Sequence, residues 1–227
     1  MQQVNFNDYK FHPSSVKKLM TNGRKKGEEF GETAKSFLKD IYIQEVFGRK
    51  KDIQTKEMKK GTLCENEALE LIEQVTKQKY FKNHKTLENE FLIGTPDVIT
   101  PDMIIDIKNA WDIWTFGSVT QASVTADYYY QLLCYMQLTG LRKAQINYCL
   151  VDTPEELISG EMYKLSYQFP HLSQEELEER FLNWFVNSDI EPEKRLKVYE
   201  FEFCEEDWLK VEQKIIKGRE YLEGITL

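Results

Sequence analysis

The N-terminal third of the chain repeats apolar residues at the spacing typical of helices. The pattern predicts a short helix that begins at Ser14 or Ser15, a second that follows Gly31 and runs to Phe47, and a third over residues 57–75. Residues 1–56 are therefore expected to form a helical N-terminal region.

Beyond residue 89 the pattern changes to short apolar runs typical of strands. Two runs, residues 90–99 and 103–109, are separated by Thr-Pro-Asp at 100–102, which predicts a hairpin turn. A third, buried strand is expected over residues 145–151, and an alternating edge strand over residues 198–203.

The remaining segments alternate between helices and polar connections. We expect helices over residues 126–138, 174–186 and 205–222, a loop over residues 110–125, and a polar insertion after Pro154. Ser173 with Glu176 three residues later is typical of a helix N-terminus. The order of elements predicts an α/β fold in which helices flank a central mixed sheet.

The length and composition favour one large unit. With 227 residues and 41% apolar content, the chain can bury a substantial core, so we expect a single domain over residues 1–227. Its parts are the helical region 1–56, a core over 57–151, and C-terminal helices with an edge strand over 152–227. We expect no secretory leader, because the first residues lack a basic start followed by an apolar run, and no membrane segment, because no apolar run approaches about 20 residues; this predicts a cytoplasmic protein.

Cysteine and histidine are too few and too scattered to form a familiar metal or nucleophile motif. The four cysteines lack C-x-x-C spacing, and the three histidines are far apart in sequence. This pattern argues against zinc, an iron–sulfur cluster and a Ser-His pair, and we expect free thiols that are mostly buried. Any bound metal would need oxygen ligands.

The net charge of −8 is unfavourable for a protein that binds phosphates. Basic residues are nevertheless frequent between Lys10 and Lys60, whereas glutamate is frequent between Glu155 and Glu220. One interpretation is a basic half that faces DNA, with Lys59 and Lys60 as candidate contacts. The other is ordinary solvated helix faces, which the charge pattern alone favours.

Two charged residues interrupt an apolar strand on one face. Side chains alternate along a strand, so Asp106 and Lys108 share a face with Ile104. Burying these charges is costly unless each is paired or bound to a metal. From the strand alone, two interpretations are equally supported. Asp106 and Lys108 are either a reactive pair, or a surface ion pair on an edge strand whose second face is exposed to solvent.

Asp97 favours the first interpretation. It lies on the preceding strand, next to Pro96 and near Gly94, which are residues that bend a strand and redirect the next side chain. Closing the turn brings Asp97 toward Asp106, and two neighbouring carboxylates repel unless a divalent cation lies between them.

Two helices add candidate polar groups. Glu65 is the one charged residue on an apolar stripe with Ala68 and Ile72, and it is either a third carboxylate of the site or a peripheral side chain. Gln131 shares a face with Tyr135, and it is either a core glutamine with a polar partner or a group that reaches phosphate or water, with Tyr135 in support.

These residues resemble a known nuclease pattern. Pro96-Asp97, an eight-residue spacer and Asp106-Ile107-Lys108 resemble the PD-(D/E)XK nuclease superfamily. The string MKKGTLCENEA at residues 58–68 is similar to the M-x-x-G-x-x-x-E-x-x-A helix of the phage-type YqaJ and lambda exonuclease (RecB-like) group. The string YQLLCYMQLTG at residues 130–140 is similar to that group's glutamine-bearing helix. The sequence departs from the group at Asp106, where the group more often has Glu.

The resemblance implies a restriction-endonuclease-like core and a Mg²⁺-dependent deoxyribonuclease, with Mn²⁺ as a substitute ion. Carboxylate and carbonyl oxygens suit Mg²⁺, so Asp97, Asp106 and the Ile107 carbonyl are the expected ligands, with Glu65 beside a second ion. Lys108 would hold or deprotonate the attacking water, and Gln131 would position water or phosphate.

The implied substrate is linear double-stranded DNA, degraded from its 5′ ends in phage-type recombination. A homo-oligomer and a single-strand annealing protein are the implied partners. The alternatives are a structure-specific or restriction-type endonuclease and a silent DNA-binding scaffold. Trp111, Trp114 and Phe116 are expected either to stack on bases or, as is more common, to pack in the core.

Overall fold

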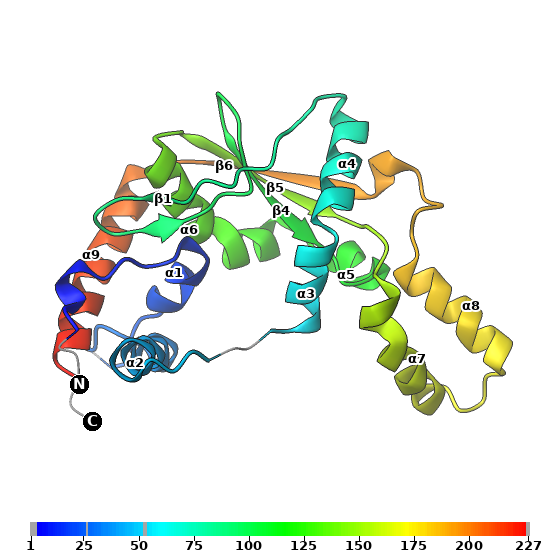
Figure 1. Cartoon of the computed structure of the whole chain (residues 1–227), viewed down its shortest axis with the longest axis horizontal. Helices are drawn as coiled ribbons and strands as arrows, with labels where there is room; N and C mark the ends of the chain where they lie inside the picture. The colour runs from blue at the N-terminus through cyan, green and yellow to red at the C-terminus, as the bar shows by residue number, and fades with distance from the viewer. Residues whose placement is uncertain (1–3, 26, 52–53, 226–227) are drawn as a thin grey trace.

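A four-stranded mixed sheet lies at the centre of the computed structural model, which describes residues 4–25, 27–51 and 54–225 (Figure 1). The strand order is β3-β4-β5-β6, with β3 antiparallel to β4, β4 parallel to β5 and β5 antiparallel to β6. The bounds are β3 Val98–Ile99, β4 Ile104–Asn109, β5 Lys143–Cys149 and β6 Leu196–Glu202. A separate hairpin pairs β1 (Leu87–Glu88) with β2 (Ile93–Gly94).

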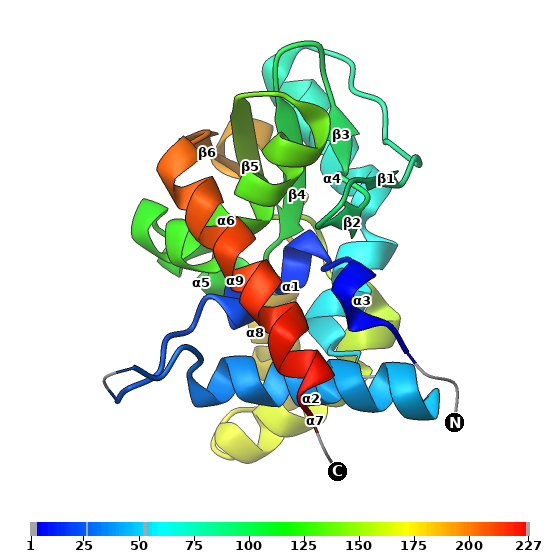
Figure 2. The ribbon, with the colours of Figure 1, turned by 90° about the vertical axis from the view of Figure 1, so that its left-hand side faces the viewer.

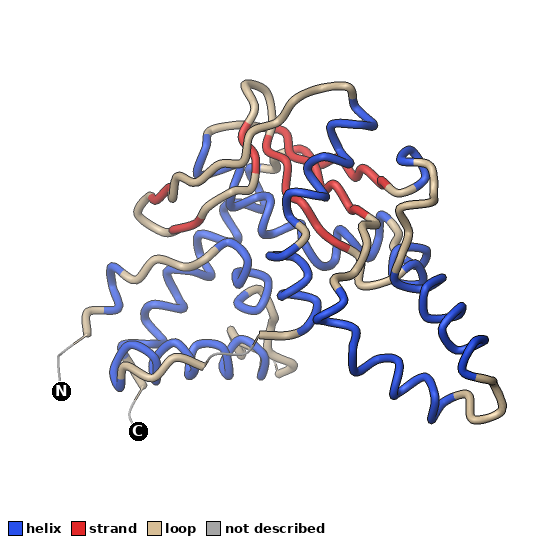
Figure 3. The backbone as a smooth tube through the Cα atoms, turned by 45° about the vertical axis from the view of Figure 1, so that its right-hand side comes forward, coloured by secondary structure: helices blue, strands red, loops and turns tan. Residues whose placement is uncertain are grey.

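Helices lie on both sides of this sheet (Figures 2 and 3), which confirms the predicted α/β class. Helix α6 (Gln121–Thr139) contacts β4, β5 and β6, and buries Leu132, Leu133 and Met136 completely. Helices α3 (Lys56–Leu63) and α4 (Glu65–Thr76) contact β4 from the other side. None of the described helices is both long and apolar enough to cross a membrane.

The predicted N-terminal helices are present and pack on the C-terminal helix. Helix α1 (Pro13–Leu19) and α2 (Glu32–Phe47) both contact α9 (Glu205–Glu223) (Figure 2). The expected serine cap of α1 is wrong, because the helix begins at Pro13, whose missing N–H needs no partner in the first turn.

The predicted helix over residues 57–75 is two helices. The break falls at Cys64, whose thiol contacts the Asp152 carbonyl at 3.5 Å and whose own carbonyl is 3.5 Å from the Asn109 amide. The helix therefore breaks at Cys64, where the backbone and the thiol contact Asn109 at the end of β4 and Asp152 in the segment after β5.

The predicted strand over residues 90–99 is also divided. Its first half pairs with β1 and its second half with β4, because the chain turns at Pro96, which has no N–H for a ladder. Gly94 is required there, since a Cβ atom would lie 2.8 Å from Cδ of Pro13. The predicted hairpin turn is confirmed, and the Thr100 N–H donates to the Met103 carbonyl.

Two segments expected to lack regular structure are helical. Residues 110–125 contain α5 (Ile113–Ser118), capped by Asp112, and the first turn of α6, capped by Thr120. The segment after Pro154 is α7 (Glu155–Gln168). Helices α7 and α8 (Gln174–Phe185) pack on each other and form an arm that projects away from the sheet (Figure 1). The predicted cap of α8 by Ser173 and Glu176 is confirmed.

Candidate active site

Asp106 and Lys108 form a buried ion pair on β4. The strand is covered on both faces, and Asp106 is only 1% exposed. Its Oδ2 atom lies 2.7 Å from Nζ of Lys108, and its Oδ1 atom accepts a hydrogen bond of 2.8 Å from the Gln131 amide on α6. The predicted shared face of Asp106 and Lys108 is confirmed, and a surface pair is excluded.

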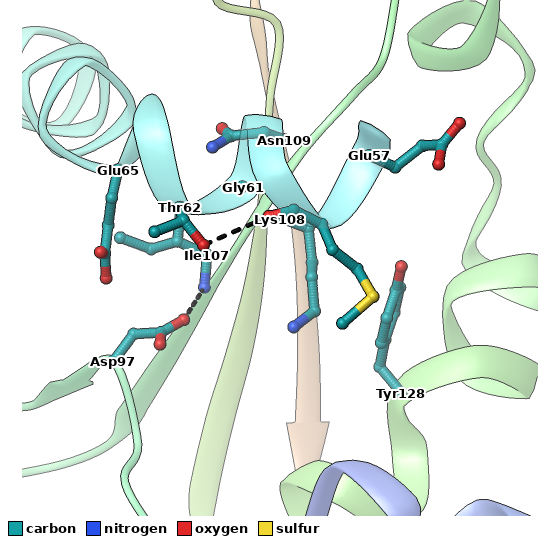
Figure 4. Close-up of a pocket in the computed structure, with 10 residues that line it drawn as sticks. Glu57, Gly61, Thr62, Glu65, Asp97, Ile107, Lys108, Asn109 and Tyr128 are labelled. Atoms are coloured by element: carbon teal, nitrogen blue, oxygen red, sulfur yellow. Dashed lines mark hydrogen bonds between the residues drawn. The ribbon is translucent and has the colours of Figure 1, made fainter. Parts of the chain in front are cut away.

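Asp97 joins this pair from the turn before β3. Its Oδ2 atom accepts a hydrogen bond of 2.8 Å from the Ile107 N–H, which crosses from β4 to the preceding segment (Figure 4). Burial and the charge of Asp106 raise the pKa of Asp97 to about 7, against the partial compensation of this hydrogen bond and of Lys108. The two carboxylates are therefore close enough to disfavour simultaneous ionisation.

Lys108 keeps its proton in this setting. Burial lowers the pKa of Lys108, but the charges of Asp106 and Asp97 outweigh that effect and raise it overall. The ammonium also lies 5.0 Å from the ring centroid of Tyr128, which is within the range of a cation–π contact. As it stands, Lys108 is a proton donor and a source of positive charge.

These groups face a pocket of about 470 Å³ between α3, α4 and β4 (Figure 4). Its lining residues are Glu57, Met58, Gly61, Thr62, Glu65, Asp97, Ile107, Lys108, Asn109 and Tyr128. Three of them are carboxylates and one is an ammonium, with Asp106 buried beside Lys108. The pocket lining thus contains more acidic than basic groups.

Glu65 reaches the pocket, but it is not free. Its carboxylate pairs with Lys82, a residue from the segment that bridges to β3. Sequence reasoning missed Lys82 because nothing local marks it. In the described parts of the chain, no three acidic, histidine or cysteine side chains converge closely enough to hold an ion without rearrangement.

Tyr135 and Gln131 support the site from α6. The Tyr135 hydroxyl donates to the Thr95 carbonyl at 3.3 Å, and its ring lies against Gly94, where an added Cβ would be 3.1 Å from the ring. Gln131 orients Asp106 through the hydrogen bond above. This bond uses one N–H of the Gln131 amide, and the contact of Gln131 with phosphate or water stays a prediction.

Three of the candidate DNA contacts are buried. Lys60 is fully buried and donates to the carbonyls of Trp111 and Val151 and to Thr153 Oγ1, so its amine is not available to a phosphate. Trp111 packs on Phe185 and is 8% exposed. Phe116 is also buried, so the predicted DNA contacts of Lys60 and Trp111 and the stacking role of Phe116 are wrong.

The other two candidates are at the surface. Lys59 is exposed on α3, and Trp114 on α5 is 64% exposed. The four cysteines, all within the described residues, are free thiols, and Cys64, Cys134 and Cys149 are buried. This agrees with the expectation from the sequence.

The chain resembles known proteins in its three-dimensional structure. No protein-family model matches the sequence, and no curated protein matches it. A phage-related exonuclease from Haemophilus somnus 129PT is similar, with a TM-score of 0.80 and 25% sequence identity over 96% of this chain and 96% of that chain.

An alkaline exonuclease from Laribacter hongkongensis is also similar. Its TM-score is 0.61 at 14% identity, over 96% of this chain and 89% of that chain. Its complex with dAMP gives a TM-score of 0.59 at 14% identity, over 94% of this chain and 88% of that chain. This chain therefore has the fold of these exonucleases over nearly its whole length.

Proposed function

We propose that this protein is a divalent-metal-dependent DNA exonuclease that hydrolyses phosphodiester bonds in linear double-stranded DNA. The observation that carries the proposal is the unit of Asp97, Asp106 and Lys108, held by Ile107 and Gln131, at the wall of an acidic pocket. It occurs on a fold shared with a phage-related exonuclease and with an alkaline exonuclease that binds dAMP. The order of these residues supports membership of the PD-(D/E)XK superfamily.

The acidic pocket supports a requirement for cations. A phosphate would be repelled by Glu57 and by ionised Asp97 unless positive charge entered first, whereas Glu65 is ion-paired with Lys82. Oxygen donors of this kind fit Mg²⁺, with Mn²⁺ as a substitute, and Asp97, Asp106 and the Ile107 carbonyl are the proposed ligands. Asp106 is paired with Lys108 and Glu65 with Lys82 in this structure, so a cation held by Asp106 would compete with Lys108, and a second ion beside Glu65 would compete with Lys82.

The bound ion would polarise the phosphate and lower the pKa of water. The protein's own groups complete the reaction. Lys108 places positive charge beside the phosphate and orients the attacking water, and it yields its proton more readily once Asp97 and Asp106 are neutralised. Gln131 keeps Asp106 in place by holding Oδ1.

The finer assignments follow from the resemblance described above. We propose 5′ to 3′ degradation in phage-type recombination, a homo-oligomeric enzyme and a single-strand annealing protein as partner. Lys59 and Trp114 are the remaining candidate contacts for DNA, because their side chains are exposed.

Cleavage of linear and covalently closed circular DNA, each with Mg²⁺ or with EDTA, tests the proposal. We expect the wild type to release nucleotides from linear DNA only, and only with Mg²⁺. Cleavage of the circle would identify an endonuclease instead. Inactivity on both substrates, without calorimetric binding of Mg²⁺ or Mn²⁺, would favour a silent scaffold.

Lys108→Ala tests the reaction centre in the same assay. We expect a loss of about 100-fold or more in turnover, because a positioned acid–base group typically contributes that much. DNA affinity and folding should change little. Lys39→Ala, which removes an exposed lysine of α2, is the matched control and should remain active. Wild-type turnover by Lys108→Ala would contradict the assignment.

A further inference from the structure

One face of α3 forms a wall of the acidic pocket. Glu57, Gly61 and Glu65 follow one another at intervals of four residues, so they lie in one row along α3 and the start of α4. Figure 4 shows Gly61 between the two glutamates. The middle of this row therefore has neither a side chain nor a charge.

Neither backbone conformation nor packing requires a glycine at this position. Gly61 lies inside α3, and it is not among the described glycines with positive φ, which are Gly27, Gly48 and Gly140. A Cβ atom built on Gly61 would meet nothing within 4 Å. Gly94 is different, because there an added Cβ would collide with Pro13.

A glycine inside a helix also lowers stability relative to alanine, because it has more backbone freedom to lose on folding. The free protein thus bears a cost at Gly61 that no contact of the described residues explains. Glycine is typical of positions where a ligand approaches the backbone closely. The open space at Gly61 faces the pocket that contains Asp97 and Lys108.

We infer that Gly61 is a substrate-contact residue, and that the sugar–phosphate backbone of the DNA strand being cut lies against α3 at this point. The inference rests on the proposed function. A polyanion in this pocket is repelled by Glu57, the charge of Glu65 is compensated by Lys82, and Gly61 between them has neither a charge nor a side chain. A strand that passes through the gap reaches Lys108 without displacing a side chain.

Gly61→Ala tests this inference, with Gly160→Ala as the matched control. Gly160 also lies inside a helix, α7, and an added Cβ there also meets nothing within 4 Å, but it does not line the pocket. Both substitutions should raise Tm by about 2 °C. Only Gly61→Ala should lower kcat/KM on linear duplex DNA, by about tenfold or more.

The binding step is measured separately, with a fluorescently labelled duplex and with Lys108→Ala present in every variant to prevent cleavage. We expect Gly61→Ala to weaken DNA affinity about tenfold and to leave calorimetric Mg²⁺ affinity unchanged. Unchanged DNA affinity, an equal loss in Gly160→Ala, or a loss confined to Mg²⁺ binding would overturn the inference. A wild type that binds DNA without cutting it would instead overturn the proposed function.

Discussion

The charge on Asp97 depends on its neighbours more than on its own chemistry. Burial and Asp106 favour the neutral acid, whereas the Ile107 N–H and Lys108 favour the carboxylate, and the balance places its pKa at about 7. Lys108 holds its proton because the charges of Asp106 and Asp97 raise the pKa of its ammonium. Without a cation, the site therefore retains protons that a bound cation would displace.

We predict that Asp97 makes the stability of the metal-free protein depend on pH. Its pKa is raised from 3.8 to about 7 in the folded state, so the folded protein binds more protons than the unfolded one between these values. The stability that this group contributes is fully present below about pH 4 and is lost as the pH rises to about 7. Urea denaturation in EDTA at a series of pH values measures this loss.

Asp97→Asn provides the comparison, because the amide cannot titrate. The free energy of unfolding of the variant should fall less steeply between pH 4 and pH 7 than that of the wild type. Parallel pH profiles for the two proteins would mean that Asp97 titrates normally in the fold. Other acids contribute to both profiles, so the difference between the proteins is the quantity of interest.

At the scale of elements, Lys60 fixes α3 to the ends of two strands. Its ammonium has three N–H donors, and it donates to Trp111 O at 3.1 Å, Val151 O at 2.9 Å and Thr153 Oγ1 at 2.7 Å. Gly61, the next residue, lines the pocket. The contact therefore sets where the α3 wall lies relative to β4.

Lys60→Met is expected to destabilise the protein by about 2 kcal/mol, because it removes the Lys60 donor from the buried Val151 carbonyl, whereas the Trp111 carbonyl still accepts from Thr153 Oγ1. Lys59→Met changes an exposed neighbour on the same helix, and it should alter stability by less than about 0.5 kcal/mol. Chemical denaturation of both variants gives the comparison. Equal stabilities would show that the ammonium does not anchor α3.

The sequence predicted correctly those elements whose structure is determined by contacts between residues close together in the chain. The turn at residues 100–102 and the helix after Ser173 are examples, since both depend on hydrogen bonds within four residues. The predicted loop over residues 110–125 failed although Asp112 and Thr120 are good helix caps. Aromatic residues there pack between elements distant in sequence, and this obscures a helical period.

The same distinction applies to the candidate site. Strand alternation sufficed to place Asp106 beside Lys108, and the turn sufficed to bring Asp97 near. Lys82 lies 17 residues from its partner Glu65, and Lys60 lies 51 and 91 residues from the carbonyls that it contacts. No local pattern contains such pairings, so their discovery required coordinates.

The whole molecule has a net charge of −8, and the pocket lining has three carboxylates and one ammonium. Under the proposed function, long-range attraction gives DNA little help, so bound cations would have to reverse the local potential. The sheet supplies the rigid base for this: β4 carries Asp106 and Lys108 between α6 on one side and α3 and α4 on the other (Figure 2).

The most direct test is the anomalous diffraction of a crystal soaked in Mn²⁺. A cation bound by Asp97 and Asp106 predicts an anomalous peak within about 2.3 Å of one oxygen from each carboxylate, in the range of ordinary metal–oxygen distances. The same soak of Asp97→Asn should give a weaker peak or none. A wild-type crystal at saturating Mn²⁺ with no peak between these two residues would contradict the account.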